Sequence, residues 1–512
     1  MSTRQRIALL ILSLLGVGIV LLATSKYGAG LSPDSVNYIG AARNLAAGKG
    51  LVTYSGHPMV IWPPLFPALL AGIKVLLGID PLLSADVVNA LLFGLIVWLS
   101  GVLCFRHLSS SSLIVLLGVT SVLLAIPLLA TAKMAWSEPL FIACVLLSLI
   151  WAESYLESGD KGSLGLLSVA AASASLSRYI GVTVIITGAI VVTLFGKQNA
   201  RTKLVHLCAF LLISVAPLAI WISRNYIVSG TPMGARSPSQ FSFILNLNFT
   251  FYTLLSWYLP LQAIQHRWVL ALLCIVIGFV TTIAARTNWK KVKARLSLLT
   301  PALIFAATYI SILLTSATIT AYDRIDDRLL SPLYVPLVLL LLVLAESSGN
   351  LLRPRFSLKV AKPILLTGVA TWLVYLAVVA SRNITSSVVS GAGGYHTDIW
   401  KESETIEFLL HGQPVSGYSY YSDYPDALYI LTGLRAQRSP VKTAHNSTEI
   451  LSEAKDLRGV WPEQGYATLV WFETNYRDYL YTVKELETIA DLEPVIRFTD
   501  ATIYLVSREG VD

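Results

Sequence analysis

A few ionisable residues beside apolar segments are the first feature of this sequence that could do chemistry. Asp34 follows Ser32 and Pro33 at the start of an expected helix, and Glu138 opens an apolar run. An ionised carboxylate that faces an aqueous cavity can accept a proton from an attacking hydroxyl group. Both acids are therefore candidate catalytic bases. The plainer alternative is that each only stabilises the N-terminus of its helix.

Three arginines lie at the ends of expected apolar helices, where they could bind a phosphate group. They are Arg178, Arg224 and Arg328. A guanidinium group binds phosphate oxygens in bidentate fashion, which makes this set a candidate site for a phosphorylated substrate. Alternatively, each arginine reaches the membrane surface or pairs with a nearby aspartate. Four further side chains are predicted to complete the substrate site: Tyr38, His57, Tyr179 and Tyr334.

Several familiar catalytic signatures are absent from the sequence. It has no G-x-x-x-x-G-K-[ST], H-E-x-x-H, G-x-S-x-G or C-x-x-C motif. Nucleotide hydrolysis, metalloprotease activity and serine hydrolase activity therefore have no support. The four cysteines fall inside apolar runs and lack the spacing of metal ligands. We expect them to be small buried side chains.

The composition indicates a membrane protein. Of the 512 residues, 55% are hydrophobic and 13% are charged, whereas a soluble domain is about 25% charged. A soluble enzyme, a disordered chain and a disulfide-rich module are therefore excluded. Residues 382–512 hold 11 Lys and Arg against 19 Asp and Glu, while the rest of the chain is basic. The bases are not clustered as nucleic-acid binding requires, so we expect no nucleic-acid partner and attribute them to membrane topology and lipid contact.

Eleven apolar runs predict eleven membrane-spanning helices, since a span needs about 20 apolar residues. The expected spans are residues 7–24, 82–105, 112–130, 138–152, 163–177, 180–195, 204–222, 268–285, 298–317, 330–345 and 363–381. Two further helices are expected to lie in the membrane interface, between the first two spans. The first begins at Ser32-Pro33-Asp34, a typical helix N-terminus, and the second covers residues 63–77.

The distribution of bases predicts the orientation in the plasma membrane. The densest groups, in residues 286–295 and 353–362, fall on the same side as the N-terminus if there are eleven spans. The positive-inside rule then places the N-terminus in the cytoplasm and the acidic tail outside. We expect a membrane domain at residues 1–381 and a small extracytoplasmic α/β domain at residues 382–512. In the tail, strands are expected at 414–419, 467–472 and 502–506, and helices at 424–432 and 481–489.

The first outer segment resembles the corresponding part of GT-C fold glycosyltransferases of the family 39 type. This group includes the protein O-mannosyltransferases and the lipid A aminoarabinose transferase. The resemblance covers most of residues 1–381 and depends on the order of several short motifs. These are DSVNYI at 34–39, ARNL at 42–45, GKG at 48–50, WPPLFP at 62–67, SEPL at 137–140, SRY at 177–179 and RLLSPLY at 328–334.

The resemblance implies an all-α membrane fold and an inverting sugar transfer. The donor would be a sugar on a polyprenyl phosphate, and the acceptor would be a hydroxyl group of a glycan, lipid or protein on the outer side. Asp34 matches the family's early acid and would be the base, with Glu138 as the second choice. The arginines would stabilise the departing phosphate. Metal-holding acidic motifs of oligosaccharyltransferases are absent from the first loop, so we expect no catalytic metal and no cofactor.

Three positions depart from the family pattern. Many relatives have a second acid where this chain has Ser35, and the aminoarabinose transferase has basic residues where this chain has Asn37 and Trp62. The exact substrate therefore cannot be taken over from the family.

Two other functions stay open: a transporter or lipid flippase, and a GT-C fold that only binds lipid. The transporter is disfavoured because the candidate polar groups lie at one membrane surface rather than at mid-depth.

Overall fold

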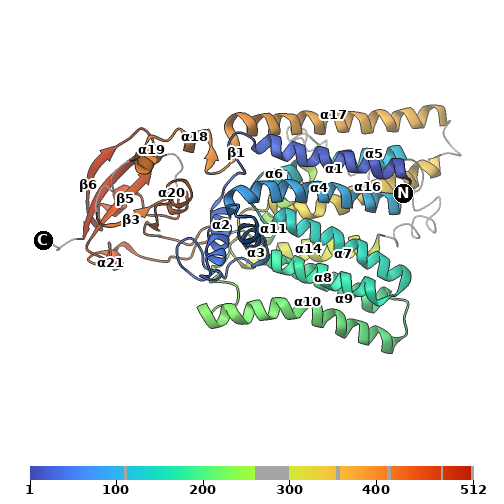
Figure 1. The fold of residues 1–512 in the computed structure, drawn as a ribbon, viewed down its shortest axis with the longest axis horizontal. Helices are drawn as coiled ribbons and strands as arrows, with labels where there is room; N and C mark the ends of the chain where they lie inside the picture. Colours follow the sequence, from blue (N-terminus) through green and yellow to red (C-terminus); the bar gives the residue numbers. More distant parts are fainter. Residues whose placement is uncertain (109–111, 260–298, 353–357, 412–416, 474–476, 509–512) are drawn as a thin grey trace.

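The structure is a computed structural model that describes residues 1–108, 112–259, 299–352, 358–411, 417–473 and 477–508. Long helices form one elongated bundle, and a small domain with a β-sheet lies beyond one end of it (Figure 1). The N-terminus lies at the opposite end of the bundle (Figure 1). The expected combination of a polytopic helical membrane domain and a small α/β domain is confirmed.

The bundle follows the apolar runs of the sequence, because a backbone in lipid must satisfy its hydrogen bonds internally. Its first part consists of α1 (Thr3–Thr24), α4 (Pro81–His107), α5 (Ser112–Leu123), α6 (Ile126–Ala132), α7 (Glu138–Ser158), α8 (Lys161–Ser177), η1 (Tyr179–Gly181), α9 (Val182–Ile190) and η2 (Val191–Phe195). Its second part consists of α10 (Ala200–Ser229), α11 (Phe243–Ser256), α14 (Thr300–Ile319), α15 (Asp327–Leu330), η3 (Ser331–Leu333), α16 (Tyr334–Leu352) and α17 (Leu358–Ser390).

Ten of the eleven expected spans coincide with these helices. The remaining one, at 268–285, lies outside the described residues. Seven of the described helical segments are long and apolar enough to cross a membrane, and α5 with α6, bent by 45°, would make an eighth. The total of eleven spans stays a prediction. Most of α4 and α7 is buried inside the bundle, whereas most of α10 and of residues 370–390 in α17 is not.

The two expected interfacial helices are present as α2 (Pro33–Ala46) and α3 (Leu65–Leu77). Ser32 Oγ caps α2 by accepting a hydrogen bond from the Ser35 amide, and Ser35 Oγ accepts one from the Ser32 amide. This reciprocal cap, with proline at the first helical position, explains why the helix begins there. Both helices lie at the end of the bundle that adjoins the small domain (Figure 1).

The small domain contains a five-stranded mixed sheet in the order β4-β3-β5-β7-β6. Strands β3 (Ser419–Ser422) and β4 (Ala436–Arg438) are parallel, and β3 is also parallel to β5 (Tyr466–Phe472). Strand β7 (Ala501–Arg508) pairs antiparallel with both β5 and β6 (Ala490–Arg497). The remaining elements are β1 (Gly391–Gly393), β2 (His396–Thr397), α18 (Asp398–Lys401), α19 (Glu404–His411), α20 (Pro425–Thr432), α21 (Ala454–Leu457) and α22 (Val483–Leu486).

The predicted elements of the tail are partly correct. The expected strands at 467–472 and 502–506 and the helix at 424–432 correspond to β5, β7 and α20. The strand expected at 414–419 instead begins at Ser419, and residues 412–416 lie outside the described chain. The helix expected at 481–489 shrinks to the four residues of α22, because the chain then turns into β6. Helix α17 continues to Ser390, beyond the boundary expected at 381.

The small domain is joined closely to the first outer segment. The Tyr395 amide donates to the Leu31 carbonyl at 2.8 Å, and the Leu31 amide donates to the Gly393 carbonyl at 3.1 Å. The ring of Tyr429 on α20 stacks on Tyr54, with their centroids 5.0 Å apart. Residues of α2, α3, α20 and the sheet share one apolar core. The small domain therefore packs directly on the segment that carries Asp34.

Candidate active site

Four charged side chains converge at one end of the bundle. Arg328 Nε and Arg178 Nη1 each lie 2.5 Å from the same Glu138 oxygen, Oε1. Arg328 also binds Asp34, through Nη2 and Oδ2. The four residues come from α2, the start of α7, the junction of α8 and η1, and α15. We call them the charge cluster. It unites four of the five charged residues predicted from the sequence.

Local structure directs each of these side chains. The cap at Ser32 places Asp34 in the first turn of α2. Arg178 is extended, with φ −150° and ψ 140°, so α8 ends immediately before it. The Asp326 carboxylate caps α15 by accepting from the amides of Arg328 and Leu329. All four charged groups therefore lie at helix termini, where polar groups can be accommodated without interrupting an apolar helix.

Two tryptophans complete the surroundings of the cluster. The Arg328 guanidinium carbon lies 4.1 Å from the ring centroid of Trp136, a cation–π distance. The Trp136 indole donates to Ser32 Oγ at 2.7 Å, which ties it to the cap of α2. The Trp62 indole donates to Asp34 Oδ1 at 3.2 Å. Among the described residues, each oxygen of the Asp34 carboxylate thus has one partner.

The cluster is formally neutral and unequally exposed. Glu138 is 1% exposed, whereas the Asp34 side chain is 27% exposed. The half-buried guanidinium groups of Arg178 and Arg328 would repel each other without compensation, and the Glu138 carboxylate compensates their charge. Its second oxygen, Oε2, is buried and has no hydrogen-bond partner among the described residues. Of the two acids, only Asp34 is accessible to solvent to a substantial extent.

Tyr38 is linked to the cluster through Ser137. Its hydroxyl is 3.2 Å from Ser137 Oγ, which also accepts a hydrogen bond from Arg178 at 3.4 Å. Tyr38 is 1% exposed, and burial raises the pKa of its phenol above the ordinary value of 10.0. It therefore stays protonated and supports the cluster through a hydrogen bond.

The other predicted site residues lie elsewhere. Arg224 donates to the carbonyls of Met59 and Leu51 and contacts no member of the charge cluster in the described chain. Tyr179 donates to the Val60 carbonyl at 2.6 Å. Two further predicted residues are also separate: His57 is exposed on a turn, and Tyr334 is fully buried in the bundle, where it donates to the Ser121 carbonyl at 3.2 Å.

Sequence reasoning missed the two tryptophans. Trp62 appears in the sequence analysis only in the WPPLFP motif and as a departure from the family pattern, and Trp136 is not singled out there. Their partners are 28 and 104 residues away in the chain. The available signal was an indole beside a proline pair and another beside Ser137-Glu138. Neither pattern indicates which polar group the indole contacts.

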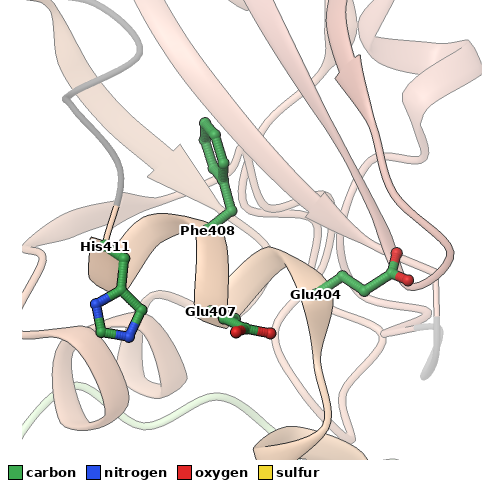
Figure 2. A pocket seen from close by; sticks show the side chains of 4 residues that line it. All are labelled: Glu404, Glu407, Phe408 and His411. Atoms are coloured by element: carbon green, nitrogen blue, oxygen red, sulfur yellow. The ribbon is translucent and has the colours of Figure 1, made fainter.

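No second chemical centre stands out in the described part of the chain. No three His, Cys, Asp or Glu residues there come together as ligands for a metal ion. A shallow hollow on α19 is lined by Glu404, Glu407, Phe408 and His411. Figure 2 shows their side chains pointing apart along the helix rather than toward a common centre. The hollow belongs to the small domain and has no convergent set of ligands.

Comparison with known proteins identifies the fold. No protein-family profile and no curated protein sequence matches the chain. ArnT from Cupriavidus metallidurans in the apo state matches with a TM-score of 0.58 and 13% identity, over 97% of both chains. ArnT bound to undecaprenyl phosphate matches with a TM-score of 0.58 and 14% identity, over 99% of this chain and 98% of that one. The chain has a GT-C fold.

The GT-C fold is also found in a more distant match. The archaeal oligosaccharyltransferase AglB from Archaeoglobus fulgidus, in complex with an inhibitory peptide and a dolichol-phosphate, matches with a TM-score of 0.50. The identity is 10%, over 91% of this chain and 70% of AglB. The resemblance drawn from the sequence is confirmed for the GT-C fold, and α2 lies at the end of that fold beside the small domain (Figure 1).

Proposed function

We propose that this protein is a membrane glycosyltransferase that uses a polyprenyl-phosphate sugar as its donor. The acceptor is a hydroxyl group of a glycan, lipid or protein on the extracytoplasmic side. The observation that carries the proposal is the charge cluster: an accessible carboxylate, Asp34, beside two guanidinium groups. In support, two proteins with the same fold have been solved with undecaprenyl phosphate and with a dolichol-phosphate.

The cluster has the groups that an inverting transfer needs. The acceptor oxygen attacks the anomeric carbon while the bond from that carbon to the phosphate oxygen breaks. Asp34 accepts the proton of the attacking hydroxyl group. The polyprenyl phosphate leaves with the electron pair of the broken bond, and Arg178 and Arg328 stabilise its charge. Because this leaving group is already a weak base, no general acid is required.

Glu138 acts on the arginines in this proposal. It holds both guanidinium groups on one oxygen and is too buried to receive an acceptor. Its role as an alternative base, expected from the sequence, is therefore the weaker assignment. The donor-phosphate role expected for Arg224 is not carried forward, because its guanidinium donates to backbone carbonyls. We propose no catalytic metal.

The proposed membrane orientation puts the cluster on the outer side. The charge cluster and the small domain adjoin, whereas the N-terminus lies at the far end of the bundle (Figure 1). A cytoplasmic N-terminus then places Asp34 and the small domain outside the plasma membrane. Donor and acceptor would meet at this outer surface.

Mass spectrometry of lipids that copurify with the protein tests the donor class. We expect a polyprenyl phosphate or its sugar derivative, enriched over a control membrane protein purified in the same detergent. The purified protein should then release free polyprenyl phosphate from a synthetic polyprenyl-phosphate sugar in the presence of an acceptor extract. Copurification without any release would favour a flippase or a lipid-binding protein.

A further inference from the structure

We propose that Trp62 is a positioning residue for the Asp34 carboxylate, and that Arg224 and Tyr179 hold Trp62 in place through the backbone before it. This inference rests on the proposed function, because it takes Asp34 as the base. We call residues 51–62 the anchored segment. It explains what Arg224 and Tyr179 do, since neither lies in the charge cluster.

Trp62 restricts the orientation of the carboxylate. Its indole N–H donates to Asp34 Oδ1 at 3.2 Å, while Arg328 holds Oδ2. A carboxylate oxygen has two lone pairs, so each oxygen keeps one for an acceptor hydroxyl group. The Trp62 ring meets the Tyr38 ring edge-on, with centroids 6.1 Å apart. The indole is therefore held between a buried tyrosine and the base.

The backbone that leads to Trp62 is held by three hydrogen bonds from other elements. Arg224 on α10 donates to the Met59 carbonyl at 2.6 Å and to the Leu51 carbonyl at 3.1 Å. Tyr179 on η1 donates to the Val60 carbonyl at 2.6 Å. The last of these carbonyls is two residues from Trp62. Two side chains that come more than 100 residues later in the sequence thus hold both ends of this short loop.

The Tyr179 hydroxyl has no hydrogen-bonding capacity left for a substrate. The Tyr179 hydroxyl donates once and accepts from Trp221 Nε1 and Asn225 Nδ2, both at 3.0 Å. One donor and two acceptor positions are all that a hydroxyl group offers. Asn225 is fully buried, and its oxygen accepts from Arg224 at 3.1 Å. Arg224 and Tyr179 therefore form one network directed at the anchored segment.

The anchored segment is closed by its own backbone hydrogen bonds. The Met59 amide donates to the Leu51 carbonyl at 3.0 Å, and the Thr53 amide donates to the His57 carbonyl at 2.8 Å. Gly56 turns the chain with φ +92°, which favours glycine. The side chain of Met59 is completely buried. Because the loop is closed on itself, fixing its two ends also fixes the chain entering Trp62.

Steady-state transfer kinetics of the full-length protein test the proposal. Trp62→Phe keeps an aromatic ring but removes the N–H. It should lower kcat about 10-fold or more, the usual worth of a hydrogen bond to a charged group. The donor KM should stay unchanged, because Arg178 and Arg328 are intact. Arg224→Ala should lower kcat similarly, and Arg224→Lys should recover part of the loss. Tyr226→Phe, on an exposed tyrosine of the same helix, is the matched control.

A double mutant separates positioning through Trp62 from an independent role. If Arg224 acts through Trp62, the double variant Trp62→Phe/Arg224→Ala should lose little more kcat than the worse single variant. Hydrogen exchange gives a second readout that does not depend on catalysis. Arg224→Ala and Tyr179→Phe should increase amide exchange in residues 51–62, and Trp62→Phe should not. Unchanged exchange in α7 would verify folding in every variant.

The outcomes distinguish this proposal from the proposed function. Normal kcat in Trp62→Phe, a multiplied loss in the double variant, or a raised donor KM in Arg224→Ala would overturn the positioning role. Asp34→Asn is measured in the same assay. If Asp34→Asn is inactive while Trp62→Phe is normal, the base stands and only the positioning role fails. If Asp34→Asn turns over normally, the base assignment itself fails, whatever the exchange data give.

Discussion

At the residue scale, the main feature is a shared arginine. Arg328 contacts both Asp34 and Glu138, whereas Arg178 contacts only Glu138 of the two acids. The two acids therefore differ in what they can do. Asp34 is partly exposed and loses one charge partner if a phosphate attracts Arg328, whereas Glu138 stays enclosed between two cations. Substitutions at the two acids should consequently impair different steps of the reaction.

Asp34→Asn should lower kcat by about 10²–10⁴-fold, the usual contribution of a positioned base. The amide keeps the size of the carboxylate and one of its two acceptor oxygens, so donor binding should survive. Glu138→Gln should instead weaken donor binding, because the two guanidinium groups lose their common charge partner. Transfer kinetics and donor binding by the same preparations check both results. Loss of turnover only in Glu138→Gln would move the base to α7.

Arg178→Ala and Arg328→Ala should each raise the donor KM by about 10–150-fold, the worth of a charge-assisted hydrogen bond. Lysine at either position should recover only part of the affinity, because it lacks the planar pair of donors. Arg224→Ala should leave the donor KM unchanged. A normal donor KM in both cluster variants would place the phosphate site elsewhere.

At the element scale, a helix cap sets the position of the base. Ser32 caps α2 two residues before Asp34, and its hydroxyl also accepts from Trp136, whose ring covers Arg328. The Ser32 hydroxyl group thus connects the start of α2, which carries Asp34, with the Trp136 ring, which contacts Arg328. Loss of that group should affect both stability and transfer.

Ser32→Ala should cost about 1 kcal/mol of stability through the lost cap, and it should also lower the transfer rate. Ser32→Thr should retain both properties, since threonine is also a good N-cap residue. Thermal unfolding in detergent and initial transfer rates measure the two effects. Ser2→Ala is the matched control, because Ser2 caps α1 with the same reciprocal motif at the far end of the bundle. Equal losses of transfer in both variants would argue against a specific role for Ser32.

At the scale of the whole molecule, the small domain and the charge cluster occupy one end, and the N-terminus occupies the other (Figure 1). A cysteine at Thr448, which is exposed in the small domain, should react with an impermeant maleimide on intact cells. A cysteine at Ser2 should react only after lysis. Both are introduced into a variant without the four native cysteines. The reverse pattern would invert the proposed topology.

The small domain should also respond to pH through a buried acid. Burial raises the pKa of Asp423 to about 7, from an ordinary value of 3.8. The folded state therefore binds the proton more tightly than the unfolded state does. This group's contribution to stability falls as pH rises between about 4 and 7, by at most about 1.4 kcal/mol per pH unit. Asp423→Asn should reduce the drop in melting temperature between pH 5 and pH 8, and an unchanged drop would contradict the shift.

Local signals in the sequence determined much of the architecture. Hydropathy located ten stretches that became described helices, and the Ser32-Pro33-Asp34 signal located the start of α2. These features depend on neighbouring residues, so they can be read without knowing the fold. The two edge strands of the sheet, the three-residue β4 and the eight-residue β6, were not predicted. Strand β6 contains Pro494 and has an irregular register, both of which an edge strand tolerates. The same two features make β6 hard to recognise as a strand from the sequence.

For the candidate site, the sequence identified the charged residues, and the tertiary structure decided their partners. Asp34, Glu138, Arg178 and Arg328 stood out because charges beside apolar segments are costly. Only packing brought residues 294 positions apart into contact and directed Arg224 to backbone carbonyls instead. A guanidinium group binds whichever acceptors the folded chain presents. The spacing of residues along the chain does not show which acceptors those are, and for the same reason the role of Trp62 could not be predicted.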